Sequence, residues 1–314
     1  MRAMRECVAT FSIVAADPRV GMWGVGVQSK FLAVGAVVPW AEAGVGAVAT
    51  QAWANVSYGP EGLALLRQGL SAEEVVDRLV QADPGRDHRQ LGVVDAHGRA
   101  AAYTGAACLE WAGHRVGPGY ACQGNILAGP AVVDAMARAY EEARDRGLPM
   151  EERLIEALRA GQAAGGDRRG QQSAALLLVK PRGGYGGYTD RWLDLRVDDH
   201  PRPIEELHRL VRLHRLYFGA PDPSRQVRLE GAVVEEVQRL LQATGYYRGP
   251  ISGRLDDATR QALRTFQLNE NFEERVVGDE VIDGDVLDYL RDLARPRPAG
   301  GGPATGSAVG GGAP

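Results

Sequence analysis

The chain has 314 residues, 45% hydrophobic and 24% charged, a globular composition that is too long for one average domain. We therefore expect a domain of about 200 residues and a smaller partner. The 36 basic and 40 acidic residues give a formal charge of −4, which leaves no positive excess for binding nucleic acid or an anionic membrane.

The first 55 residues are rich in Val, Ala and Gly and are broken by turn signals such as Asp17-Pro18, a pattern that predicts short strands. The predicted strands span 10–16, 23–29, 33–40 and 45–52. Two helices follow, at 59–68 and 71–82. The second opens with the capping box Ser71-x-x-Glu74 and carries an apolar face.

A hairpin is predicted at 91–95 and 99–104, with further strands around 116–122. Helices at 131–146 and 150–160 and strands at 173–179 and 192–197 complete this part. Because the strands come in runs and do not alternate singly with helices, we expect an α+β fold of antiparallel sheets with helices outside them. A doubly wound parallel sheet is disfavoured.

The second part of the chain is predicted to be helical. A helix at 204–218 ends the sandwich domain, 10–219, and a Pro-rich linker spans 220–226. Helices at 229–243, 257–269 and 283–294 form a small domain, 227–295. Residues 1–9 are an extension, and the Gly-, Pro- and Ala-rich segment 296–314 is expected to be disordered.

Cysteine usage and the N-terminal segment favour the cytoplasm. Cys7, Cys108 and Cys122 form no C-x-x-C pair, so a disulfide framework is not expected. No signal peptide is recognisable, and the longest apolar runs fall far short of the roughly 20 residues that span a bilayer.

No cofactor or metal site is predicted. Gly24-x-Gly26 and Gly44-x-Gly46 lack the third glycine and the following helix of a dinucleotide site. The six histidines are scattered without zinc-ligand spacing. The closest approach to a G-x-S-x-G elbow, Gly170 to Ser173, lies at the entry of a strand.

Three blocks carry a resemblance to a known family: the segment from Ala9 to Leu66, the sequence QGNILAG at 123–129, and GGDRRGQQSAALLLV at 165–179. Over about 10–219 the chain resembles the bacterial family called domain of unknown function 1028. That family is similar in fold to the N-terminal nucleophile hydrolases. The resemblance thus implies a four-layer αββα sandwich of two antiparallel sheets between helical layers, with no assigned substrate.

The same resemblance implies a catalytic role for Thr10, at the start of the first strand. A chain-terminal Thr carries its own base, because its α-amine, whose pKa is ordinarily about 8, takes the hydroxyl proton. Lys30 is the candidate that lowers the pKa of this amine, and Asn125, with the backbone of Gly124, is the candidate oxyanion donor. Asp167 completes the candidate catalytic set.

Residues that flank these positions are the candidate substrate contacts. They are Ser29, Gln123, Gln171 and Ser173. The alternatives stay open: Thr10 as a simple strand former, Lys30 as a solvated strand end, and Gln123 with Asn125 as partners of a buried turn.

Nine residues precede Thr10, whereas relatives often begin Met-Thr. A terminal Thr10 therefore requires a later start or processing, and otherwise Thr10 is never terminal. Cys7 is a lesser alternative nucleophile.

The segment from Val237 to Gln267 resembles the peptidoglycan-binding helical module, whose helices bury apolar faces. The resemblance implies Tyr246, Tyr247 and Arg248 as ligand contacts, the alternative being a packing role. The module is expected to bind wall precursors, recycled wall fragments or a protein. The alternative is that it serves only as a lid or as a dimerisation element that makes a homodimer.

Two functions remain open. The first is an amide hydrolase of the N-terminal nucleophile type, acting on a small amide or peptide that includes wall-derived ones. The second is a noncatalytic binding or assembly protein in which the helical module recognises peptidoglycan fragments or a protein partner.

Overall fold

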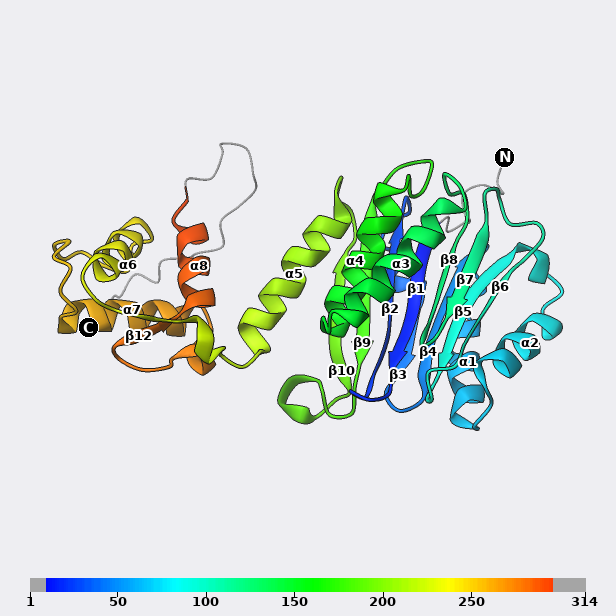
Figure 1. Cartoon of the computed structure of the whole chain (residues 1–314), viewed down its shortest axis with the longest axis horizontal. Helices are drawn as coiled ribbons and strands as arrows, with labels where there is room; N and C mark the ends of the chain where they lie inside the picture. The colour runs from blue at the N-terminus through cyan, green and yellow to red at the C-terminus, as the bar shows by residue number, and fades with distance from the viewer. Residues whose placement is uncertain (1–9, 296–314) are drawn as a thin grey trace, which may run out of the picture. The chain divides into compact units, whose positions relative to one another are not determined.

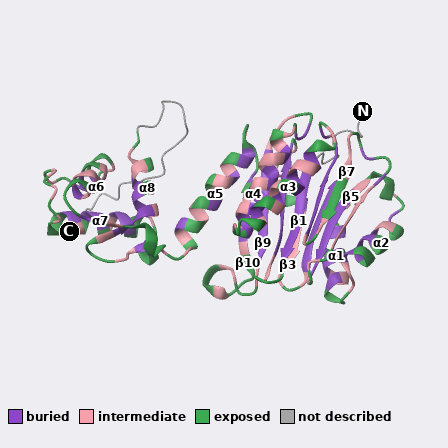
Figure 2. Cartoon of the chain, in the orientation of Figure 1, coloured by how far each residue is buried: buried purple, intermediate pink, exposed green. Residues whose placement is uncertain are grey.

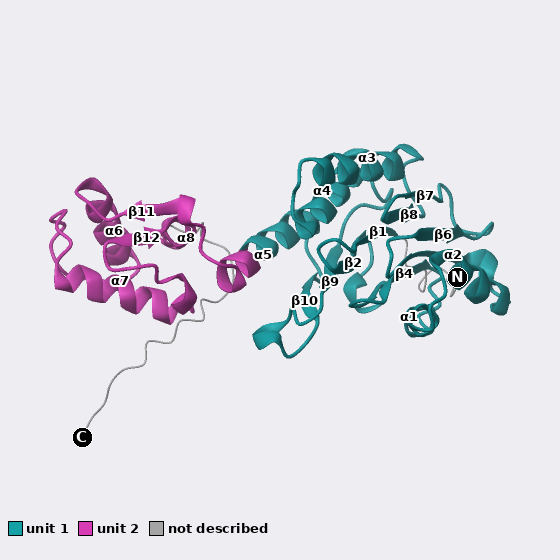
Figure 3. Ribbon diagram, turned by 60° about the horizontal axis from the view of Figure 1, so that its bottom comes forward, with its two compact units in different colours: residues 1–212 teal, residues 213–314 magenta. Residues whose placement is uncertain are grey.

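The computed structural model describes residues 10–295 and divides the chain into two compact units (Figure 3). The division falls between Arg212 and Leu213, inside helix α5 (Pro203–Phe218), and so earlier than the expected boundary at 219. The reason lies in the packing of α5. Ile204 and Leu207 belong to the core of the first unit, whereas Leu216 belongs to the core of the second.

The first unit contains a six-stranded sheet in the order β10-β9-β2-β1-β8-β7 (Figure 1). All neighbours in it are antiparallel. Its strands are β1 (Thr10–Asp17), β2 (Met22–Ser29), β7 (Gly113–Gly117), β8 (Tyr120–Gly124), β9 (Ser173–Val179) and β10 (Arg191–Val197). β1 and β2 form a hairpin that places Thr10 opposite Ser29.

A second, four-stranded antiparallel sheet has the order β3-β4-β5-β6. Its strands are β3 (Pro39–Glu42), β4 (Gly46–Ala52), β5 (Arg89–Asp95) and β6 (Ala100–Thr104). Its outer face packs against α1 (Tyr58–Arg67) and α2 (Ala72–Ala82). The predicted capping box of α2 is confirmed, since the side chains of Ser71 and Glu74 bond to each other's backbone N–H.

The two sheets lie face to face, with helices on their outer faces. α3 (Ala131–Asp145) and α4 (Met150–Ala163) cover the six-stranded sheet. Successive side chains of β1 alternate between the two faces of the sheet. Phe11 and Ile13 pack against these helices, whereas Val14 packs against the second sheet. The central strands are therefore buried on both faces (Figure 2). The antiparallel sheets with outer helices expected from the order of elements are present.

The described part of the second unit, residues 213–295, contains the end of α5, three further α-helices and a short two-stranded sheet. Its elements are β11 (Gln226–Arg228), α6 (Ala232–Ala243), α7 (Asp257–Asn269), β12 (Val281–Asp283) and α8 (Gly284–Leu293). Aromatic packing centres on Phe266 and Phe272. Arg275 is buried beside them. Its guanidinium bonds to Asp283 and to the carbonyl oxygens of Arg215 and Leu216 at the end of α5.

Some sequence expectations differ from the structure. The segment 33–40 is not one strand, because Val34–Ala36 forms a 3₁₀ turn and β3 begins only at Pro39. Gly35 lies so close to Ala175 and Arg196 that a Cβ atom there would clash. β11 and β12 were not predicted, since three residues are too few to show a period. The expected extension 1–9, with Cys7, and the tail 296–314 lie outside the described residues.

Within 10–295, no helix is long and apolar enough to cross a membrane. Cys108 and Cys122 are buried and are not joined by a disulfide. In the same part of the chain, no group of His, Cys, Asp or Glu side chains could hold a metal ion.

Candidate active site

Thr10 begins β1, and its side chain is fully buried on the face of the sheet that meets the second sheet. Its hydroxyl donates a hydrogen bond to Ser29 Oγ at 3.1 Å. Its carbonyl oxygen accepts one from the backbone N–H of Asn125 at 3.0 Å. Thr10 is thus held by the strands on both of its sides.

The space between the sheets changes character along β1. Around Val14 and Ala16 it is filled with apolar side chains. Towards Thr10 and Ser12 it is filled with buried polar ones. The polar side chains gathered here from both sheets are Thr10, Ser12, Ser29, Gln51, Gln90, Gln123 and Asn125. Because buried polar groups are costly unless they are bonded, this end of the layer has to be organised as a network.

Gln90 fixes the direction of that network. Its Nε2 donates to the carbonyl oxygens of Gly124 at 2.8 Å and Gly113 at 3.2 Å, and to Thr104 Oγ1 at 2.9 Å. Since carbonyl oxygens only accept, the Gln90 amide has one orientation. Its Oε1 must then accept, and it does so from Gln51 Nε2 at 2.9 Å and Asn125 Nδ2 at 3.0 Å.

The network continues from Gln51 across to the first sheet. Gln51 Oε1 accepts from the Ser12 hydroxyl at 2.6 Å, and Ser12 Oγ accepts from Gln123 Nε2 at 2.7 Å. Gln51 Nε2 also lies 3.4 Å from the carbonyl oxygen of Thr10. Two sheets are therefore tied together directly behind the candidate nucleophile.

Two buried oxygens at the ends of this network have no donor among the described residues: Gln123 Oε1 and Asn125 Oδ1. A buried acceptor without a donor costs about 1–3 kcal/mol. The backbone N–H of Asn125 is bonded to Thr10 and one N–H of its Nδ2 to Gln90. The second N–H of Nδ2 is the donor that remains for the expected oxyanion role, which stays a prediction. Asn125 also leaves Oδ1 open as an acceptor, which suits an N–H or ammonium group.

The network reaches the surface at His114. Thr104 Oγ1, which accepts from Gln90, lies 2.9 Å from His114 Nδ1. Desolvation of the ring lowers the pKa of His114, which favours a neutral imidazole that accepts the Thr104 proton.

Lys30 follows β2, and its side chain is exposed. Its ammonium donates to the carbonyl oxygen of Gln171 at 3.2 Å, and its backbone N–H lies 3.3 Å from Asp167 Oδ2. Asp167 is buried and is also bonded to Arg169. Lys30 and Asp167 therefore join the end of β2 to the loop before β9.

The hydroxyl of Ser173, at the start of β9, makes its hydrogen bonds to backbone groups. Its hydroxyl donates to the carbonyl oxygen of Phe31 at 2.5 Å and accepts from the N–H of Val34 at 3.1 Å. Gln171 contributes its backbone carbonyl to Lys30. Of the expected substrate contacts, Ser29 thus lies against Thr10, and Gln123 belongs to the hydrogen-bond network behind it. Ser173 instead stabilises the turn that follows β2.

Ser12, Gln51 and Gln90 were not singled out from the sequence. The signal was present, since each is an uncharged polar residue in a strand that also carries an apolar run. A strand covered on both faces has no solvent side, so its polar residues have to meet one another.

In the second unit, the loop from Gly245 to Gly249 and one side of α7 border a hollow of about 430 Å³. Tyr246, Tyr247 and Arg248 all line it. Tyr247 is buried, with its hydroxyl bonded to Pro250 O, and Tyr246 bonds to Glu270 and packs on Phe266. The two tyrosines thus combine a packing role with a position in a hollow.

Comparison with known proteins gives two family matches and several similar solved structures. The family of unknown function DUF1028 matches residues 10–207, and the putative peptidoglycan binding domain PG_binding_2 matches residues 217–290. The crystal structure of protein SPO2555 from Silicibacter pomeroyi, described under DUF1028, is 32% identical, with a TM-score of 0.61. The match covers 69% of this chain and 93% of that one. Curated proteins gave no match.

Proposed function

Because the chain belongs to the family of unknown function DUF1028, we propose an activity from its own residues: an amide hydrolase whose nucleophile is Thr10. The observation that carries the proposal is the buried hydrogen-bond network behind Thr10. It ends in two oxygens, Gln123 Oε1 and Asn125 Oδ1, that accept no hydrogen bond from the described residues. An amide substrate brings an N–H donor, and its amine product brings more. The layer order also resembles that of the N-terminal nucleophile hydrolases, where such a Thr starts the chain.

The proposed reaction uses the α-amine of Thr10 as base. The amine takes the proton from Oγ1 while Oγ1 attacks the amide carbonyl. The C–N bond breaks, the leaving amine departs with that proton, and the acyl group stays on Oγ1 as an ester. Water then hydrolyses the ester, which releases a carboxylic acid and restores the hydroxyl. The base exists only if Thr10 is terminal, because in a longer chain its nitrogen is part of a peptide bond.

Ser29 and Asn125 have proposed positioning roles. Ser29 Oγ lies 3.1 Å from Thr10 Oγ1 and orients it. Asn125 Oδ1, a buried acceptor, is placed by Gln90 to receive an N–H of the α-amine or of the leaving group. Lys30, whose ammonium is bonded to Gln171, has a proposed structural role at the site's edge.

For the second unit we propose recognition of peptidoglycan fragments, in keeping with its family match. The hollow beside Tyr246 and Arg248 offers an aromatic ring and a guanidinium. The guanidinium of Arg248 makes no hydrogen bond or ion pair to residues 10–295. Aromatic faces and charged donors of this kind suit sugar rings and their acyl substituents. The proposed substrate class is therefore a small wall-derived amide or peptide, handled in the cytoplasm.

The test is a screen of amide substrates, including muropeptides, with a chain made to begin at Thr10. Thr10→Ala should abolish turnover and keep the fold, while Thr10→Ser, which retains a hydroxyl, should keep a measurable rate. Equal turnover by the Thr10→Ala variant would reject Thr10 as nucleophile. No turnover of any substrate, with muropeptide binding retained, would favour the noncatalytic binding protein.

A further inference from the structure

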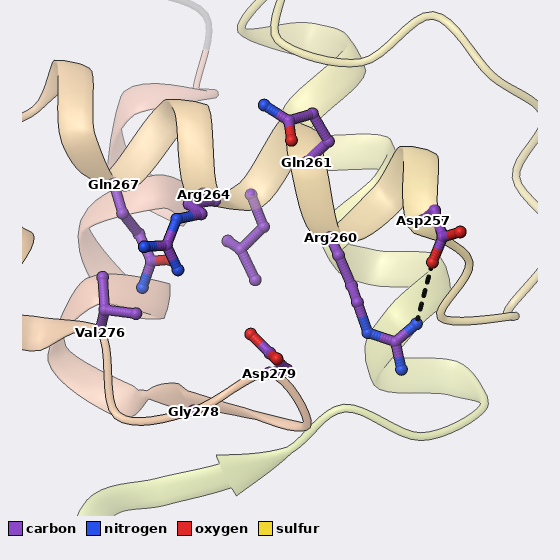
Figure 4. Close-up of a pocket in the computed structure, with 9 residues that line it drawn as sticks. Asp257, Arg260, Gln261, Arg264, Gln267, Val276, Gly278 and Asp279 are labelled. Carbon is purple, nitrogen blue, oxygen red and sulfur yellow. Dashed lines mark ion pairs between the residues drawn. The ribbon is translucent and has the colours of Figure 1, made fainter.

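A second hollow of the helical unit, of about 240 Å³, lies along α7 and is closed by the segment before β12 (Figure 4). The charged groups at its rim include Arg260 and Arg264 of α7 and Asp279 of the closing segment. It does not contain the tyrosines considered above, and nothing in the sequence pattern singled it out.

The charges in this hollow are not all satisfied internally. Arg260 is committed, since it donates to the carbonyl oxygen of Leu255 at 2.6 Å and lies 3.9 Å from Asp257. The side chains of Arg264 and Asp279 are exposed, and neither makes an ion pair or hydrogen bond to the rest of residues 10–295. In Figure 4 the Asp279 carboxylate points into the space between the two arginines. One guanidinium and one carboxylate therefore remain open in the same hollow.

The floor of the hollow is neutral. Leu263 and Gln267 are 5% and 4% exposed, and Val276 is half-buried. Gln267 brings an amide that both donates and accepts, while Leu263 and Val276 provide a short apolar wall. A ligand here thus meets a cation, an anion, an amide and a small apolar surface within a volume suited to one amino-acid residue.

The open guanidinium and carboxylate together favour a ligand that carries both an anionic and a cationic group. A phosphate or another simple anion would be attracted by Arg264 but repelled by Asp279, and a simple amine would meet the reverse. A group that carries a carboxylate and an ammonium on one carbon satisfies both, since a guanidinium binds carboxylates with two parallel hydrogen bonds and a carboxylate accepts from an ammonium.

We propose that this hollow binds the zwitterionic amino-acid end of a wall stem peptide, with Arg264 on the α-carboxylate and Asp279 on the α-ammonium. The inference rests on the proposed recognition of peptidoglycan fragments and names the part that is recognised. Among stem peptides, a diamino acid with a second carboxylate presents such an end on its unlinked side chain, whereas a lysine side chain presents an ammonium alone. The hollow therefore distinguishes the two kinds of stem peptide.

The experiment is calorimetric titration of the full chain with L-Ala-γ-D-Glu-meso-diaminopimelate. Comparison ligands are the same tripeptide acetylated on the distal amine, the tripeptide amidated on the distal carboxylate, and the tripeptide with lysine in the third position. Arg264→Gln and Asp279→Asn should each weaken binding of the first ligand about tenfold or more. The matched controls are Arg254→Gln and Glu274→Gln, exposed charges outside the hollow, which should bind like the parent.

Combining each protein variant with each modified ligand shows which side chain binds which ligand group. Amidation of the carboxylate should weaken binding to the parent chain but make little further difference to Arg264→Gln, and acetylation of the amine should make little further difference to Asp279→Asn. Unchanged affinity of both variants for the tripeptide would overturn the inference. If wall sacculi are still retained by those variants, the inference alone fails. If the parent chain retains neither sacculi nor tripeptide, the proposed recognition of peptidoglycan fails as well.

Discussion

Gln90 Oε1 accepts a hydrogen bond from Asn125 Nδ2 at 3.0 Å, across the space between the two sheets of the first unit. Gln90 lies on β5 of the four-stranded sheet, and Asn125 follows β8 of the six-stranded one. This contact orients Asn125 beside Thr10, whose carbonyl oxygen accepts from the Asn125 N–H. The proposed site is therefore built by residues of both sheets.

Replacement of Gln90 by Leu should destabilise the first unit. It removes the acceptor of Gln51 and Asn125 and the donor to Gly124 O, which leaves buried polar groups unbonded. We expect the free energy of unfolding to fall by about 2–4 kcal/mol. Urea unfolding measures this. Gln81→Leu, a change of the same type at an exposed position of α2, is the control and should shift stability by under about 0.5 kcal/mol.

Gly92→Ala should disturb the site more than the fold. A Cβ at this position would lie 2.3 Å from Gln123 Oε1, so the amide of Gln123 has to move. We expect amide turnover to fall about tenfold or more, since small misplacements of site groups are costly to catalysis. The control is Gly129→Ala, where a Cβ meets nothing within 4 Å. Equal rates for the two variants would argue against a role for Gln123 in the site.

Asp17 and Arg153 form a buried ion pair at 2.8 Å, at the other end of β1. Hydrogen bonds from Arg19 and Arg153 lower the pKa of Asp17 from 3.8 to about 2, against the opposing effect of burial. Because the pKa is lower in the folded state, the stabilisation is complete above about pH 4 and is lost as the pH falls towards 2. Asp17→Asn should cost about 3 kcal/mol or more at pH 7, since it leaves Arg153 without its charge partner.

The measurement for Asp17 is urea unfolding of the parent chain and Asp17→Asn at pH 7 and at about pH 3. The difference between them should shrink at the lower pH, where the parent carboxylate begins to protonate. Arg19 is exposed, so Arg19→Gln should cost less than about 1 kcal/mol. A difference that is the same at both pH values would contradict this account of the pair.

Arg275→Met should unfold the second unit selectively. Arg275 is 1% exposed, and its guanidinium bonds to Asp283 and to two carbonyl oxygens at the end of α5. Removing it leaves the buried carboxylate of Asp283 without its cation, which costs about 3–5 kcal/mol. Protease digestion should then degrade residues 213–295 and spare 10–212, whereas Arg254→Gln should leave both units resistant.

Local sequence signals predicted most of the elements. The bounds predicted for β9 and α7 match the structure, because β9 is a continuous apolar run before a turn and α7 has an Asp cap and a helical period. The 3₁₀ turn at Val34–Ala36 was missed because its apolar residues are buried by tertiary packing and not by strand pairing.

The site was predicted less completely, for a physical reason. Thr10, Ser29 and Gln123 lie on adjacent strands of one sheet and Asn125 directly follows one of them, so the four could be grouped through the family resemblance. Gln51 and Gln90 come from the other sheet, and no spacing in the sequence reveals which residues two stacked sheets bring together. The same limit applies to Arg264 and Asp279, which line one hollow only because of the way the segment before β12 folds back to α7.

The most direct test of the central claim is the intact mass and N-terminal sequence of the protein purified from its native host, determined on a sample whose amide hydrolysis is measured. A Thr10 nucleophile that uses its own α-amine predicts an active chain that begins at Thr10. A chain that still begins at Met1 and has full activity would contradict that mechanism.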